Sequence, residues 1–130
     1  MKKILVVEDN EINMYLSCRI LKSSGYEVIE ARSGEEGVEL AIKEKPDLII
    51  MDIQLPGIDG YEATKRLRKS EADGEIPIIA LTSYAMAGDR KKAIKAGCTG
   101  YIEKPINPET FISEIKKFLE VKNEKNNSSG

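Results

Sequence analysis

Five short runs rich in Val, Ile and Leu alternate along the chain with more polar stretches of helix length. The runs lie at residues 3–7, 27–31, 47–51, 77–81 and 100–102. The third and fourth runs are almost wholly apolar, as expected of strands that are buried on both faces of a parallel sheet. The strict alternation therefore predicts the α/β class, with a doubly wound, five-stranded parallel sheet flanked by five helices.

Capping residues mark where the helices between these runs begin and end. The expected N-caps are Asn10, Ser33, Asp59 and Asn107, and the expected C-terminal glycines are Gly25 and Gly97. Because 130 residues suit a single core, we expect one domain over residues 1–121. The apolar periodicity is lost after Leu119, so residues 122–130 are expected to form a flexible tail.

Charge and composition narrow the classes of ligand. Lys and Arg total 20 against 22 Asp and Glu, a formal net charge of -2, whereas a nucleic-acid-binding domain usually carries a basic excess. No apolar run approaches the roughly 20 residues that span a bilayer. We therefore expect a cytoplasmic protein that binds neither nucleic acid nor membrane directly. Cys18 and Cys98 lack CxxC spacing and are expected to be buried small hydrophobes rather than a disulfide or redox pair.

Polar residues gather where the predicted strands end. Glu8 and Asp9 follow the first run, Asp52 the third, Thr82 the fourth and Lys104 the fifth. The carboxyl ends of parallel strands meet at one edge of the sheet, which is where ligands bind in doubly wound folds. Three carboxylates brought together repel one another unless a hard cation lies between them, so we expect Mg²⁺ as a cofactor.

The polar residues at the strand ends predict phosphoryl chemistry. The chain has no His, so general base catalysis by imidazole is excluded and the chemistry falls to carboxylates, hydroxyls and lysine. A carboxylate such as Asp52 can attack phosphorus directly, with Lys104 and Thr82 stabilising the transferred charge. Taken singly, Glu8 and Asp9 fit ordinary first-turn acids of a helix, Lys104 a solvated charge and Thr82 a turn hydroxyl. Together, at matching strand ends, they favour a site.

The residues at 8–10, 51–60, 81–83 and 101–105 together resemble the receiver domains of bacterial two-component signalling, and the resemblance covers about residues 2 to 120. It implies a flavodoxin-like sheet in the order 2-1-3-4-5 and a cis peptide bond before Pro105. It also implies roles for the strand-end residues. Asp52 would be the phosphoacceptor, Glu8 and Asp9 would hold Mg²⁺ together with Asp52 and the backbone carbonyl of Gln54, and Thr82 and Lys104 would contact the phosphoryl oxygens.

The resemblance further implies a conformational switch and a docking surface. Tyr101 would be an aromatic switch residue that moves inward when Thr82 is drawn toward the phosphoryl group; the alternative is a strand tyrosine packed at the rim. Ile12 and Tyr15 of the first helix, with the loop containing Pro105 and Ile106, would dock on a histidine kinase or a histidine phosphotransferase.

Incidental surface apolarity is nearly as good an explanation of these docking candidates. In the same helix, the spacing predicts a buried stripe of Asn13, Leu16, Ser17, Ile20 and Leu21. Lys91, Lys92 and Lys95 of the fourth helix are interpreted as a solvated face rather than a basic patch for a partner.

The leading functional hypothesis is a single-domain response regulator that catalyses only its own aspartyl phosphorylation and dephosphorylation. It would act by changing its binding to an unknown downstream protein. A receiver module excised from a hybrid histidine kinase, serving as a phosphorelay intermediate or phosphate sink, is the alternative, and Met1 at the head of the first run weakly favours an independent chain.

Two further hypotheses are weaker. A haloacid-dehalogenase-type phosphatase would need an acid where Gln54 stands, and a degenerate receiver that binds its partners constitutively would not need the full set of phosphorylation residues. The resemblance to receiver domains also implies that Gln54 and Tyr84 flank the acyl phosphate and influence attack by water, and a bulky Tyr84 is expected to slow hydrolysis.

Overall fold

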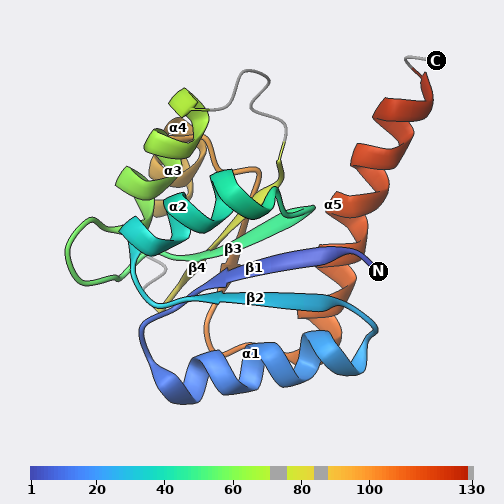
Figure 1. Cartoon of the computed structure of the whole chain (residues 1–130), viewed down its shortest axis with the longest axis horizontal. Helices are drawn as coiled ribbons and strands as arrows, with labels where there is room; N and C mark the ends of the chain where they lie inside the picture. Colours follow the sequence, from blue (N-terminus) through green and yellow to red (C-terminus); the bar gives the residue numbers. More distant parts are fainter. Residues whose placement is uncertain (71–75, 84–87, 129–130) are drawn as a thin grey trace.

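The computed structural model describes residues 1–70, 76–83 and 88–128, and its centre is a single twisted sheet (Figure 1). All strand pairs are parallel, and the order β2-β1-β3-β4-β5 is the one expected. The strands are β1 (Lys3–Val7), β2 (Glu27–Ala31), β3 (Leu48–Asp52), β4 (Ile78–Thr82) and β5 (Gly100–Glu103). Both β3 and β4 are buried along their whole length, which explains their lack of polar alternation.

Helices cover both faces of this sheet (Figure 1). They are α1 (Glu11–Ser23), α2 (Gly34–Glu44), α3 (Gly60–Ser70), α4 (Asp89–Ala96) and α5 (Pro108–Ser128). Helices α1 and α5 pack on one face, whereas α2, α3 and α4 pack on the other. Among the described residues, no helix is both long enough and apolar enough to cross a membrane.

The predicted caps fix the start of four helices. The side-chain oxygens of Asn10, Ser33, Asp59 and Asn107 accept hydrogen bonds from backbone N–H groups three residues later, at 2.9, 3.1, 2.9 and 3.1 Å respectively. Each bond satisfies a donor that has no partner within its helix. At the C-terminal ends, Gly97 caps α4 and has a φ of 112°. Gly25, which has a φ of 90°, directly follows Ser24, the C-cap of α1.

The predicted buried face of α1 needs correction. In α1, Leu16 is 47% exposed, while Met14 and Cys18 are buried with Ser17 and Leu21, so the buried stripe is rotated from the one expected. The packing of the helix against the sheet selects this phase, because Met14 and Cys18 complete a cluster with residues of β1 and α5. Helix α5 continues to Ser128, so residues 122–128 of the expected tail are helical. Their flexibility stays a prediction.

Both cysteines are buried and free, as predicted. Cys18 lies in the layer between the sheet and α1, with its Sγ 3.6 Å from Met14 Sδ. Cys98 lies on the opposite side of the sheet, where its Sγ is 3.7 Å from Thr64 Oγ1.

Candidate functional site

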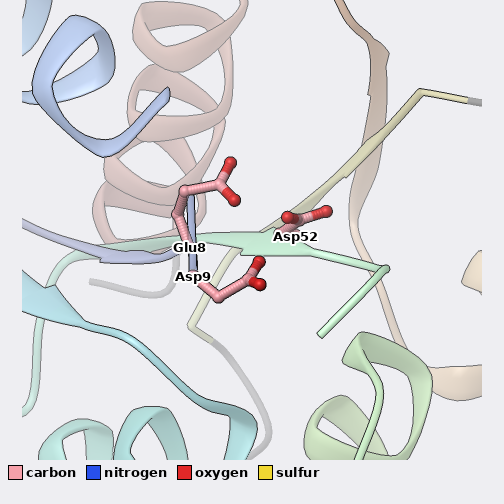
Figure 2. A group of neighbouring side chains, drawn as sticks. All are labelled: Glu8, Asp9 and Asp52. Carbon is pink, nitrogen blue, oxygen red and sulfur yellow. The ribbon is translucent and has the colours of Figure 1, made fainter. Parts of the chain in front are cut away.

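The predicted strand-end residues meet at one edge of the sheet. Glu8 and Asp9 lie just beyond β1, Asp52 ends β3, Thr82 ends β4 and Lys104 follows β5. Carboxylate oxygens of Glu8, Asp9 and Asp52 all lie within 4.8 Å of one another. Figure 2 shows the carboxylates of Glu8, Asp9 and Asp52 gathered at the ends of their strands.

The carboxylates differ in burial. Glu8 and Asp52 are only 2% and 3% exposed, whereas Asp9 is exposed. Glu8 is held at both ends, because its backbone N–H donates to Ala31 O at 2.9 Å and its Oε2 accepts from the N–H of Asn10 at 3.2 Å. The rim therefore has two acids enclosed by protein and one that faces solvent.

Lys104 reaches back over the buried pair. Its Nζ donates to Glu8 Oε1 at 2.9 Å and to Asp52 Oδ2 at 3.2 Å. Burial alone would lower the pKa of Lys104, but the hydrogen bond to Glu8 and the charge of Asp52 outweigh it and raise that pKa above its usual value. The lysine is thus held as a cation at the centre of the site.

The clustered acids are only partly compensated by this lysine. The pKa of Glu8 is raised above its usual value, first because the side chain is buried and then because it lies beside Asp52, while Lys104 acts in the opposite direction. One ammonium group therefore does not offset the whole cost of bringing the carboxylates together. Their oxygens are the donors that Mg²⁺ prefers, and the group fits a site for that ion.

Asp52 presents its two oxygens to different partners. The backbone N–H of Gln54 donates to Oδ1 at 3.2 Å, and Lys104 holds Oδ2. The Gln54 side chain is exposed. Sequence reasoning missed this amide, because a hydrogen bond between residues two positions apart depends on the turn after the strand.

Thr82 and Tyr101 lie together at the β4–β5 side of the rim. Thr82 is buried, and its backbone oxygen accepts from the N–H of Lys104 at 2.7 Å. Burial raises the pKa of the half-buried Tyr101, while Arg90 and a side-chain hydrogen bond with Thr82 act to lower it. The guanidinium carbon of Arg90 is 5.6 Å from the centre of the Tyr101 ring, within the range of a cation–π contact. Arg90 gave no signal in the sequence. Tyr84 lies outside the described residues.

The docking candidates fall in two groups. Ile12 and Tyr15 are 71% and 59% exposed, as predicted. The peptide bond before Pro105 is cis, also as predicted, and Pro105 and Ile106 line a cleft of about 190 Å³. The other residues that line this cleft are Asn13, Leu16, Ile20, Lys104 and Pro108. Sequence reasoning missed Leu16 as a surface residue, because it assigned that side chain to the core.

A model of the response regulator receiver domain matches residues 4–116. The polar-differentiation response regulators DivK of Brucella ovis and Brucella anthropi are 48% and 47% identical to this chain over 118 residues. Both alignments cover 91% of this chain and 96% of the relative.

Solved structures show the same similarity. A CheY-like receiver domain protein from Methanospirillum hungatei matches with a TM-score of 0.89 and 31% identity, over 96% of this chain and 98% of that chain. The receiver domain of the sensor histidine kinase PA1611 from Pseudomonas aeruginosa matches with a TM-score of 0.85 and 36% identity, over 92% of this chain and 98% of that chain. That structure holds a magnesium ion coordinated in its active site cleft.

Proposed function

The chain belongs to the response regulator receiver family, and from that premise we propose that Asp52 accepts a phosphoryl group from a histidine kinase or a histidine phosphotransferase in the cytoplasm. The observation that carries the proposal is the position of Lys104 Nζ between the buried carboxylates of Glu8 and Asp52. A cation held at that point is well placed to contact an oxygen of an incoming phosphoryl group.

The transfer needs no general base. An oxygen of Asp52 attacks phosphorus while the P–N bond of the donor phosphohistidine breaks, and the bonding electron pair stays on the imidazole nitrogen. One P–O bond thus replaces one P–N bond. The absence of His from this sequence is consistent with that chemistry, because the donor brings the imidazole.

Four residues would hold Mg²⁺: Glu8, Asp9 and Asp52 through their carboxylates, and Gln54 through its backbone carbonyl. When bound, the ion supplies neutralisation of charge on the transferred phosphoryl group. Glu8 and Lys104 are already paired, so Glu8 also orients the lysine. Thr82 would donate its hydroxyl to a second phosphoryl oxygen.

Phosphorylation would change the surface around Tyr101. Movement of Thr82 toward the phosphoryl group alters its hydrogen bond with Tyr101, and movement of the ring alters its contact with Arg90 on α4. The added charge at Asp52 supplies the difference in free energy that such a two-state change requires. The output is then altered binding of a downstream protein rather than turnover of a substrate.

The donor would dock beside the acceptor. Ile12 and Tyr15 expose apolar surface on α1, and the cleft lined by Pro105 and Ile106 adjoins Lys104. This arrangement places an apolar contact surface next to the acidic rim, so a docked helix carrying phosphohistidine would reach Asp52.

We favour a single-domain regulator because the Brucella DivK relatives are covered over 96% of their own length. A receiver module of a hybrid histidine kinase is the second candidate, favoured by the similarity to the PA1611 receiver domain. Mixing the phosphorylated protein with a histidine phosphotransferase distinguishes the two candidates. Rapid back-transfer of the phosphoryl group to histidine supports the relay module, and retention of the aspartyl phosphate supports the regulator.

Intact-mass spectrometry after incubation with acetyl phosphate and Mg²⁺ tests the phosphoacceptor. We expect one phosphoryl adduct on the parent protein and none on Asp52→Asn or in a sample without Mg²⁺. Glu39→Gln, which removes an exposed acid of α2, is the matched control and should be modified like the parent. An adduct that persists on the folded Asp52→Asn variant would contradict the assignment.

A further inference from the structure

The connection between β3 and α3, residues 53–59, is a tightly closed turn. The N–H of Gly60 donates to Ile53 O at 2.9 Å, and a Cβ on Gly60 would collide with the backbone oxygen of Asp52. Inside this turn, the N–H of Gln54 reaches back 3.2 Å to Asp52 Oδ1. The path of the connection therefore sets the orientation of the Asp52 carboxylate.

The first turn of α2 packs directly on this connection. Gly34 is buried, and a Cβ placed on it would lie 2.6 Å from Ile58 Cγ1 and 2.9 Å from Ile58 O. Side-chain rotation alone does not relieve such a contact, because one of the two atoms belongs to the backbone. The absence of a side chain at residue 34 is what permits this close approach.

The first turns of α2 are capped and closely packed against the sheet. Ser33 caps the helix through the N–H of Glu36 at 3.1 Å. One turn along, a Cβ on Gly37 would lie 2.8 Å from Val7 Cγ2, so α2 is also pressed against β1. Ala41 and Val38 of α2 pack in the core cluster, so moving the helix away would expose buried apolar surface, and we expect an added methyl group at residue 34 to displace the connection instead.

We propose that Gly34 is a positioning residue for the phosphoacceptor site: its lack of a side chain seats residues 53–59 so that the Gln54 N–H holds Asp52 Oδ1. This inference rests on the proposed function of Asp52 and adds a residue of α2 to the machinery of the site. With Oδ1 held by Gln54 and Oδ2 by Lys104, the carboxylate has one orientation, and displacing the turn would release one of its two restraints.

The test is Gly34→Ala, followed by calorimetric titration with Mg²⁺ and by amide hydrogen exchange in metal-free protein. We expect the dissociation constant for Mg²⁺ to rise about tenfold, as for other changes to the supports of metal ligands. Exchange of the Gln54 amide should become about tenfold faster, because that N–H loses Asp52 Oδ1.

Ile58→Ala provides the rescue arm. It removes Cγ1 and Cδ1, two of the three Ile58 atoms that face Gly34. When Ile58→Ala is already present, adding Gly34→Ala should raise the Mg²⁺ dissociation constant by clearly less than about tenfold, because only the contact with the backbone oxygen of Ile58 remains. A merely destabilising effect of Gly34→Ala would leave the Mg²⁺ dissociation constant of the folded protein at its parental value.

Gly37→Ala is the matched control on the same helix. Its methyl group would meet Val7 rather than the connection, so we expect a lower midpoint of urea unfolding with parental Mg²⁺ affinity and parental exchange at Gln54. Parental values for Gly34→Ala, equal weakening by Gly37→Ala, or no relief when Gly34→Ala is combined with Ile58→Ala would each overturn the proposal.

Two outcomes need separate handling. If Gly34→Ala fails to fold, Ile58→Ala alone tests the proposal. The half-buried Ile58 supports the turn, so its truncation should speed exchange of the Gln54 amide. Unchanged exchange would overturn the proposal.

If the parent protein binds no Mg²⁺ and accepts no phosphoryl group, the proposed function fails. The exchange measurements still decide whether Gly34 seats the turn.

Discussion

The two helical layers are built from different side chains. The layer under α1 and α5 is filled by large groups such as Met14, Leu21 and Phe111. The layer under α2, α3 and α4 contains many small residues: Ala31, Ala41, Ala63, Ala80 and Ala93, with Gly34, Gly37 and Gly60 at close approaches. The first layer supplies much of the buried apolar volume, whereas the second brings backbone segments near enough to shape the acidic rim. Truncating a side chain should therefore lower the free energy of unfolding most in the first layer. Adding side-chain volume should lower it most in the second layer.

The largest expected effect is in the first layer. Phe111 is fully buried, so Phe111→Ala should lower the free energy of unfolding by about 3–5 kcal/mol, through lost burial and a residual cavity. Urea unfolding measures the loss. Phe118→Ala, at a partly buried position of the same helix, is the control and should cost less. Equal losses would mean that α5 is held by its overall hydrophobicity rather than by Phe111.

Added volume tests the second layer. Ala63 is fully buried in α3, and Ala63→Val should cost about 1–3 kcal/mol because a close-packed layer does not expand freely. Lys65→Val, at an exposed position of the same helix, corrects for the lower helix propensity of Val. A corrected cost near zero in urea unfolding would show that the second layer is loosely packed, and would break the contrast.

The end of α4 nearest the start of β5 offers a third test. Arg68 on α3 donates from Nε to Gly97 O at 2.9 Å and from Nη2 to Thr99 Oγ1 at 3.3 Å. Arg68→Ala should cost about 1–2 kcal/mol by leaving the partly buried carbonyl of Gly97 without this donor, and should speed amide exchange in the last turn of α4. Arg66→Ala breaks an exposed pair with Glu62 and should cost well under that amount. Unchanged amide exchange in the last turn of α4 would show that Arg68 does not hold this helix in place.

A smaller effect of opposite sign is expected in the first layer. Ser17 Oγ is buried and has no hydrogen-bond partner among the described residues. Ser17→Ala should raise the free energy of unfolding by about 1 kcal/mol, because a buried hydroxyl without a partner costs desolvation. Ser113→Ala, on an exposed face of α5, measures how much of that gain comes from helix propensity alone. A loss of stability would indicate that Ser17 is hydrogen-bonded in solution.

The smallest expected effect concerns the buried thiols. Burial, with a further contribution from Glu30, raises the pKa of Cys18 to about 11. The neutral thiol is thus favoured by folding, so its contribution to stability is present below pH 9 and is lost as the pH rises through about 11. Alkylation with iodoacetamide at about pH 8, below the ordinary thiol pKa, should be much slower at Cys18 in folded than in urea-unfolded protein when mapped by peptide mass. Equal rates would show that this layer opens readily.

Local patterns were sufficient to predict the strands, the caps and the identity of the clustered acids. Apolar runs and capping residues act over a few positions, so Asn10 and Ser33 start their helices where the sequence indicated. The phase of α1 was predicted wrongly, because a stripe that includes Leu16 and one that includes Met14 are nearly equally apolar. Choosing between them requires the shape of the surface against which the helix packs.

The sequence by itself determined the parallel sheet and the meeting of Glu8, Asp9, Asp52, Thr82 and Lys104 at one edge, because strand ends in a parallel α/β fold are brought together by topology. Only the tertiary structure decided that Glu8 is buried and paired with Lys104, that Gln54 and Lys104 hold different oxygens of Asp52, and that Gly34 lies against Ile58. The reason is physical. Topology follows from local periodicity, whereas burial, hydrogen-bond direction and close contact depend on residues far apart in the chain and on small differences in distance.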